Sequence, residues 1–266
     1  MTRLSLAFSP CPNDTFMFHA LLHGLVDTGG LEYAAHLHDI DELNEFAFSG
    51  LFDVTKMSFF AYLKLQDNYR LLDAGAALGF GCGPLLVARN LEAFSPDATI
   101  AIPGEMTTAS LLLQLWNPGI HHTVVTRFDD ILPGVARGVY DAGLIIHEGR
   151  FVYQNYGCRK IVDLGQWWEE ETGLPIPLGC IAVKKASPAM DHREAIQTDI
   201  RQSIQYAVNH PETSRDFIRK HAQEMDDQVI DGHIQLYVNP FSLELGEVGE
   251  AAICKLEEMA LWADIL

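Results

Sequence analysis

The sequence predicts an α/β fold, and three observations support this class. Short β-branched or apolar runs alternate with longer amphipathic runs along the chain, a pattern typical of a parallel sheet covered by helices. The 266 residues are enough for two lobes that each bury a core. The content of 48% hydrophobic and 20% charged residues is that of an ordinary folded chain, which disfavours disordered, collagen-like and disulfide-stapled proteins.

The first part of the chain predicts strands that lead into helices. Pro10 and Pro12 break the first strand, and the side chains of Asn13-Asp14-Thr15 can cap the helix that follows. The expected elements are strands over Leu4–Phe8, Leu31–Leu37, Asp53–Met57, Arg70–Asp73 and Gly83–Arg89, and helices from Asn13 to Gly24, over Asp41–Phe48 and over Phe60–Leu65.

A second α/β unit follows a glycine-rich stretch, Gly75–Gly83, where we expect the first crossing between lobes. This unit is predicted to hold strands over Thr99–Ile102, Thr123–Thr126 and Ala142–Ile146, and helices over Thr107–Trp116 and Asp130–Val139. The apolar run Leu178–Val183 is the expected return strand. Helices are expected over Asp191–Asn209, from Pro211, over Asp226–Val238 and over Glu247–Trp262.

Two α/β lobes joined by two crossing segments predict the type II periplasmic-binding-protein architecture, in which a ligand lies in the cleft between the lobes. We expect lobe I to comprise residues 1–88 and 178–266, and lobe II residues 89–177. In open α/β sheets, ligands bind at the carboxyl ends of strands, so the residues directly after each predicted strand are the candidates for the site.

Net charge and composition limit which partners and which cell compartment the sequence is consistent with. The formal net charge of −18 disfavours nucleic acids and anionic membrane surfaces. The apolar stretches are far shorter than the roughly 18 residues that span a bilayer, and no secretion signal is readable. Five scattered cysteines without C-x-x-C spacing are typical of reduced thiols. The expected setting is therefore the cytoplasm. A small anionic molecule as partner would have to be held by local N–H groups, hydroxyls or a few cations against the overall charge, and the oligomeric state is not predicted.

The sequence gives no sign of a cofactor or metal. Neither a G-x-G-x-x-G turn before a helix nor a Walker loop occurs, which leaves nucleotide cofactors unsupported. The pairs His36/His38 and His121/His122 have no third ligand at a readable spacing. We therefore expect no metal site and no nucleotide cofactor.

Three polar segments follow predicted strands and are candidates for substrate contacts. Ser9 and Asn13 stand at a helix start suited to anions, although an ordinary capped turn is about equally consistent. Lys56-Met57-Ser58 places a cation and a hydroxyl at a strand end, where a solvated lysine is the plainer alternative. Thr107, Thr108 and Ala109 open a helix whose amides could hold a carboxylate or phosphate.

His147 follows a predicted buried strand and is the candidate general base, because an imidazole titrates near neutral pH. A packed, non-catalytic histidine is about as consistent with the pattern. Cys11 at a helix start could be a nucleophile, but the sequence assigns it no histidine partner, and a free cysteine is usually structural. The tryptophans Trp167 and Trp168 are interpreted as core residues.

Several sequence blocks, in the same order and spacing, resemble the 1,4-dihydroxy-6-naphthoate synthase family of the futalosine route to menaquinone. The blocks are SPCPNDTF, TKMSFFAY, GAALGFGCGPLLVAR, PGEMTTA, GLIIHEGRFVYQNYG, DLGQWWEEETGLPIPLG and NPFSLELG, which together extend from Ser9 to Gly246. The likeness therefore covers nearly the whole chain.

The resemblance implies a cofactor-free lyase that converts cyclic dehypoxanthine futalosine to 1,4-dihydroxy-6-naphthoate and a three-carbon fragment, expected to be dihydroxyacetone. It places the proton acceptor on His147 and substrate contacts on Lys56, Met57, Ser58, Thr108 and Ala109. The alternatives are a non-catalytic solute-binding protein of the same fold, the related chorismate dehydratase, and, least supported, a cysteine hydrolase built on Cys11.

Overall fold

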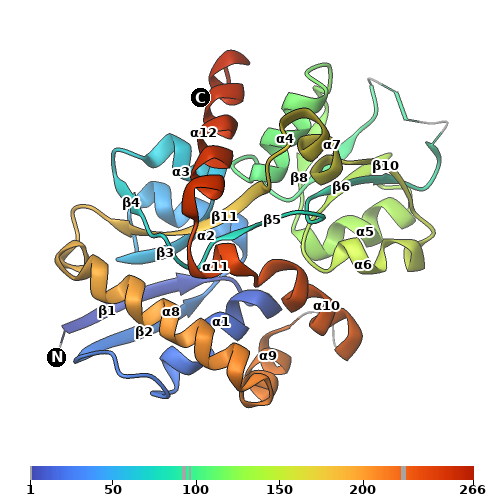
Figure 1. Cartoon of the computed structure of the whole chain (residues 1–266). Helices are drawn as coiled ribbons and strands as arrows, with labels where there is room; N and C mark the ends of the chain where they lie inside the picture. The colour runs from blue at the N-terminus through green and yellow to red at the C-terminus, as the bar shows by residue number, and fades with distance from the viewer. Residues whose placement is uncertain (1, 92–93, 96, 223–225) are drawn as a thin grey trace.

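The computed structural model describes residues 2–91, 94–95, 97–222 and 226–266, and it forms two sheets side by side (Figure 1). The predicted α/β class is confirmed. None of the helices in the described ranges is long and apolar enough to span a bilayer.

The first sheet has the strand order β2-β1-β3-β11-β4, with β5 also paired to β11. β1 runs parallel to β2 and β3, whereas β11 runs antiparallel to β3, β4 and β5 because it brings the chain back from the second sheet. The strands are β1 (Thr2–Phe8), β2 (Leu31–Leu37), β3 (Val54–Ser58), β4 (Tyr69–Leu71), β5 (Ala77–Gly79) and β11 (Ile176–Lys184).

The second sheet has the order β10-β6-β9-β7-β8, in which β7 is parallel to β8 and β9. Its strands are β6 (Leu85–Ala88), β7 (Ile100–Ile102), β8 (Thr123–Val125), β9 (Ala142–Ile145) and β10 (Arg159–Asp163). β6 pairs with β9 and β10, so sheet membership changes between Gly79 and Leu85. The predicted lobe boundary after residue 88 lies later than this change, and the lobe division itself stays a prediction.

Helices cover both sheets, and the C-terminal ones return to the first sheet (Figure 1). α1 and α8 pack together on the apolar face formed by Leu4, Leu6 and Phe8 of β1. The helices are α1 (Pro12–Leu22), α2 (Ile40–Ser49), α3 (Phe59–Leu65), α4 (Thr108–Trp116), α5 (Phe128–Ala136), α6 (Gly149–Val152), α7 (Leu164–Thr172), α8 (Arg193–Asn209), α9 (Arg215–His221), α10 (Asp227–Tyr237), α11 (Pro240–Leu243) and α12 (Gly246–Trp262).

Most predicted elements are present, with ends shifted by a few residues. The strand over Leu31–Leu37 has the predicted bounds. The helix expected from Asp191 begins as an α-helix only at Arg193, because Pro188–His192 forms a 3₁₀ turn. β5, α6, α7, β10 and α11 were not predicted. α7 does carry readable signals, since the Asp163 side chain accepts hydrogen bonds from two N–H groups of its first turn and Gly173 ends it in a left-handed conformation.

One apolar core runs through both sheets near the crossing segments. It joins Met57 of β3 and Cys180 of β11 to Leu86 of β6 and Leu112 of α4, and it includes Trp168, which is fully buried as expected. The side chains of Asn239 and Ser242 donate hydrogen bonds to the Leu78 and Ala76 carbonyls, which fastens the NPFSLELG segment to β5. The strand ends that face each other across the cleft are therefore held on a continuous packed base.

Candidate active site between the two sheets

A cleft lies between the sheets and holds about 630 Å³ of space, which includes open solvent at its mouth. It is formed at the ends of β1, β3 and β9 and at the first turn of α4, as expected for an open α/β sheet. Eight of the nine predicted site residues line it, namely Ser9, Asn13, Lys56, Ser58, Thr107, Thr108, Ala109 and His147, together with Asp14, His233, Tyr237 and others that were not predicted.

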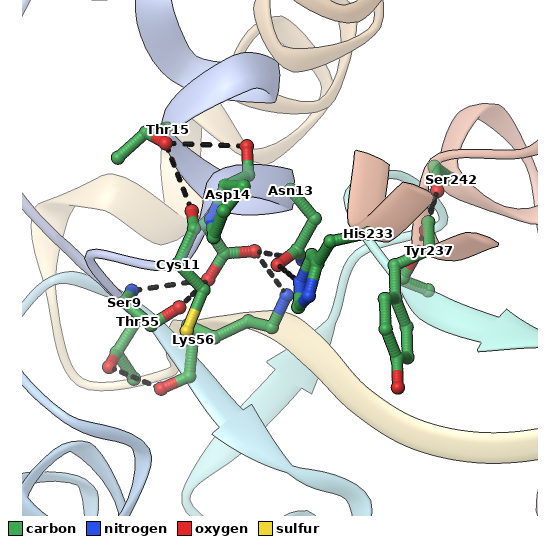
Figure 2. Close-up of polar contacts among 12 residues, drawn as sticks. Ser9, Cys11, Asn13, Asp14, Thr15, Thr55, Lys56, His233, Tyr237 and Ser242 are labelled. Carbon is green, nitrogen blue, oxygen red and sulfur yellow. Dashed lines mark hydrogen bonds and ion pairs between the residues drawn. The ribbon is translucent and has the colours of Figure 1, made fainter. Parts of the chain in front are cut away.

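The Asp14 carboxylate organises the first-sheet wall of the cleft. It is fully buried and accepts hydrogen bonds from the Ser9 N–H (3.1 Å) and hydroxyl (2.7 Å) and from the Asn13 amide (2.9 Å). The Lys56 ammonium, only 4% exposed, lies 2.7 Å from the same carboxylate (Figure 2). The predicted substrate contacts Ser9, Asn13 and Lys56 thus share one buried anion, and Lys56 is not the solvated lysine of the plainer alternative.

This network also fixes the tautomer of His233, which comes from α10 near the other end of the chain. Because the Asn13 amide nitrogen donates to Asp14, its oxygen faces His233 Nε2 at 2.9 Å, so Nε2 carries the proton (Figure 2). Burial lowers the pKa of His233 well below its usual value, and the neighbouring His147 and Lys56 act in the same direction. His233 is therefore neutral, and its buried Nδ1 has no hydrogen-bond partner within the described ranges.

The start of α4 forms the opposite wall. Thr107 caps the helix by accepting a hydrogen bond from the Ser110 N–H. First-turn N–H groups have no acceptor within the helix, so those of Thr108 and Ala109 can serve an anion. The Thr108 hydroxyl is already engaged: it accepts from the Phe60 N–H (3.2 Å) and donates to the Leu178 carbonyl (2.8 Å), which ties α4 to the first sheet.

β3 presents alternate residues to the cleft. Lys56 and Ser58 line it, and Asn44 fixes Ser58 by bonding both its hydroxyl and its N–H. Met57, the ninth predicted site residue, does not line the cleft. Its side chain points to the other face of the strand and is buried in the core, as the alternation of a strand requires. A contact between Met57 and substrate could involve only the backbone.

His147 follows β9 after one residue, in a left-handed backbone conformation with φ of 54° that residues other than glycine seldom adopt. Its half-buried ring packs edge-on against Phe128 and lies 6.2 Å, centroid to centroid, from the nearly parallel ring of His233. Desolvation lowers the pKa of His147 to about 4; Asp14 opposes this shift and Lys56 adds to it. At neutral pH the imidazole is uncharged and can accept a proton.

Cys11 occupies the N-cap position of α1 without a side-chain capping bond, and it is buried. The structure supplies the histidine partner that the sequence did not, because polar atoms of Cys11, His147 and Glu148 lie within 4.8 Å of one another. Burial, followed by the charge of Glu148, raises the pKa of the Cys11 thiol well above its usual value. The thiolate is disfavoured, which argues against a cysteine nucleophile.

The fold places the chain in the class of periplasmic-binding-protein-like α/β proteins. It superimposes on a Candida albicans protein described as having the generic periplasmic binding protein fold, with a TM-score of 0.72, 15% identity and coverage of 100% and 91% of the two chains. An alkanesulfonate-binding protein from Xanthomonas axonopodis gives 0.71 at 13% identity, covering 100% and 94%. These likenesses concern the fold alone.

Sequence comparison identifies the family within this class. Residues 4–261 match the family model described as menaquinone biosynthesis, and the chain belongs to this family. A 1,4-dihydroxy-6-naphthoate synthase of Thermus thermophilus is 47% identical over 96% of this chain and 93% of its own length. One from Streptomyces coelicolor is 46% identical, covering 94% and 90%. A solved structure from Archaeoglobus fulgidus has a TM-score of 0.93 at 37% identity, covering 99% and 98%.

The buried ion pair predicts a strong coupling between Lys56 and Asp14. Lys56→Met leaves the Asp14 carboxylate buried without a cation, and we expect the free energy of unfolding to fall by about 3–5 kcal/mol. In the double variant with Asp14→Asn no lone charge remains, so its loss should be smaller than the sum of the single losses by about 0.5–3 kcal/mol. Chemical denaturation measures both, with the exposed Lys160→Met as control; additive losses would contradict the coupling.

Proposed function

We propose that this chain is a 1,4-dihydroxy-6-naphthoate synthase, a lyase that converts cyclic dehypoxanthine futalosine to 1,4-dihydroxy-6-naphthoate and a three-carbon fragment, expected to be dihydroxyacetone. The observation that carries the proposal is the 46–47% identity, over nearly the full length, to two proteins of that name. The cleft supports it with a neutral imidazole, helix amides and a buried polar wall.

In the proposed reaction His147 is the general base. It takes a proton from the substrate, a carbon–carbon bond then breaks, and the new ring becomes aromatic, which drives the step forward. The closed cleft keeps water away from the reacting atoms. The neutral state of His147 and its place on the cleft wall support this role.

The substrate carboxylate is proposed to bind at the N–H groups of Thr108 and Ala109, at the positive end of α4. Lys56 is the alternative partner, but the charge of Lys56 is already balanced by Asp14 at 2.7 Å. The positive potential at the start of α4 is therefore less balanced by negative charge than that of Lys56. Ser9, Asn13, Ser58 and Thr107 complete the proposed contacts, while Met57 contributes through its backbone.

His233 is a further proposed contact that the sequence did not reveal. Its protonated Nε2 is held by Asn13, and its Nδ1 is a buried acceptor on a ring that lines the cleft. We assign this nitrogen to a substrate hydroxyl, because a buried acceptor without a partner costs about 1–3 kcal/mol that a bound donor would recover.

The proposal places the protein in the cytoplasm with a small anionic partner, which local groups of the cleft must hold against the repulsion of the overall charge of −18. The same charge disfavours nucleic acid and anionic membrane surfaces as partners. Two alternatives are separable by experiment. A solute-binding protein would bind the compound without turnover, and a chorismate dehydratase would consume chorismate instead. The desolvated imidazole favours catalysis over binding alone, since function follows the site rather than the fold.

Turnover of cyclic dehypoxanthine futalosine tests the proposal directly. The wild-type protein should form 1,4-dihydroxy-6-naphthoate, followed by chromatography and mass, and His147→Ala should be slower by about 100-fold or more because it lacks the base. His147→Asn is the matched variant, because asparagine tolerates the left-handed backbone at this position. Binding without turnover would overturn the enzyme assignment. Equal turnover by all three proteins would show that a residue other than His147 is the base.

The pH dependence tests the state of His147. Because its neutral form is the active one and its pKa is about 4, kcat/KM should be nearly flat from about pH 6 to 8 and fall only as the pH approaches 4. The assay runs from about pH 4 to 8, with circular dichroism confirming the fold at each pH. A midpoint near the ordinary histidine value of 6.5 would show that the base is not desolvated.

The proposed substrate contact of His233 predicts that its replacement lowers kcat/KM but leaves the pKa of His147 unchanged. His233→Phe keeps an aromatic ring but removes both nitrogens, so kcat/KM should fall by about 5- to 150-fold, the equivalent of a lost buried hydrogen bond. The acid limb of the pH profile should keep its midpoint, because His233 is neutral and places no charge beside His147. An unchanged kcat/KM, or a shifted midpoint, would contradict the assignment.

A further inference from the structure

A thiol, an imidazole and a carboxylate meet where the two sheets face each other. Cys11 stands at the start of α1 in the turn after β1, and His147 and Glu148 form the turn between β9 and α6. One ligand atom of each lies within 4.8 Å of the other two. Cys11 and Glu148 are buried and His147 is half-buried, so this is an enclosed cluster rather than a surface group of acids.

The donor set selects the kind of ion. Sulfur and imidazole nitrogen with one carboxylate oxygen suit Zn²⁺ or Cd²⁺, whereas Mg²⁺ and Ca²⁺ prefer oxygen ligands only. Bond lengths of about 2.0–2.3 Å put the ligands of a tetrahedral zinc roughly 3.3–3.7 Å apart. Because the ligand atoms of this cluster lie within 4.8 Å of one another, the side chains need to approach by at most about 1.5 Å to reach that geometry.

The local charge favours a divalent cation. Binding replaces the thiol S–H bond by an S–metal bond and releases the proton to solvent. The thiolate and the Glu148 carboxylate then balance the two charges of the ion, which is the requirement for burying it. The Glu148 carboxylate is the charge inside the cluster that attracts a cation, whereas Asp14 nearby is balanced by Lys56. His147 is uncharged at neutral pH and offers a lone pair.

We propose that Cys11, His147 and Glu148 form a site for a thiophilic divalent cation, with Zn²⁺ as the reference ion, that inhibits the enzyme. The ligands come from the first sheet on one side and the second sheet on the other, so a bound ion clamps the two walls together. It also occupies the imidazole lone pair that would accept the substrate proton. Metal binding at this site does not depend on the proposed function. Inhibition by the metal rests on the proposed function, because it requires His147 to be the general base.

Metal binding is tested first without substrate, on chelator-treated full-length protein. Titration with Co²⁺ should give a thiolate-to-cobalt charge-transfer band, and Zn²⁺ should displace it with a stoichiometry of one. Cys11→Ser should abolish the band, and Cys11→Ser and Glu148→Gln should each weaken Zn²⁺ binding by at least the roughly 10–100-fold that loss of an outer-shell partner costs. Cys254→Ser removes an exposed thiol and is the matched control, with band and affinity unchanged.

Inhibition is tested separately in the turnover assay. Zn²⁺ and Cd²⁺ should abolish product formation by the wild type and by Cys254→Ser, a chelator should restore it, and Mg²⁺ at the same concentration should have no effect. A Co²⁺ band that survives Cys11→Ser, or is lost in Cys254→Ser, places the ion elsewhere and overturns the site. Specific binding without inhibition would overturn the inhibitory role alone, and a wild type that makes no product even without metal would count against the proposed function.

Discussion

The buried carboxylate of Asp14 is the constraint on which the cleft depends. A charge in the interior is costly unless a cation and hydrogen-bond donors surround it. Here the donors come from the end of β1, the first turn of α1 and the end of β3, so satisfying one carboxylate fixes three segments relative to each other. Asn13 extends the same requirement to α10 through His233. Buried polar groups that would destabilise an apolar core therefore fix the geometry of the first-sheet wall of the cleft.

The two walls of the cleft are built differently. The first-sheet wall is held by charge, whereas the second-sheet wall uses backbone: the first turn of α4 and the left-handed turn that carries His147. Hydrogen bonds from Thr108 to Leu178 and from Asn44 to the Met106 carbonyl connect the walls. The same walls enclose part of the His147 ring, and this burial lowers the pKa of the imidazole.

The sequence predicts most of this arrangement where local chemistry decides it. Strand ends followed by Ser9, Lys56, Thr108 and His147 are readable, because the carboxyl ends of strands gather at one edge. Met57 illustrates a limit: the alternation of β3 turns its side chain into the core, although the resemblance pointed to its position. Asp14 looked like an ordinary helix cap, because its ion pair with Lys56 forms only once β1 and β3 lie side by side.

The sequence could not predict the place of His233 in the cleft, or the closeness of His147 to Cys11, for the same reason. Each depends on contact between segments far apart in the chain, and neither carries a spacing signal. β5 and β10 escaped prediction because pairing makes the strand: β5 is three residues of a glycine-rich stretch that pair with β11, and β10 is an edge strand paired only with β6 among the described strands. Tertiary context decides such elements more than propensity does.

The neutral ion pair and the neutral imidazole together shape how the site would respond to an anionic substrate. Lys56 and Asp14 cancel each other, so a carboxylate that binds at the start of α4 adds a net negative charge to the cleft. A nearby negative charge favours the protonated form of an imidazole and raises its pKa. The base would then be weak in the free protein, where burial lowers the pKa of His147 to about 4, and stronger once the substrate is bound. In that arrangement the substrate itself supplies part of the basicity needed for its own deprotonation.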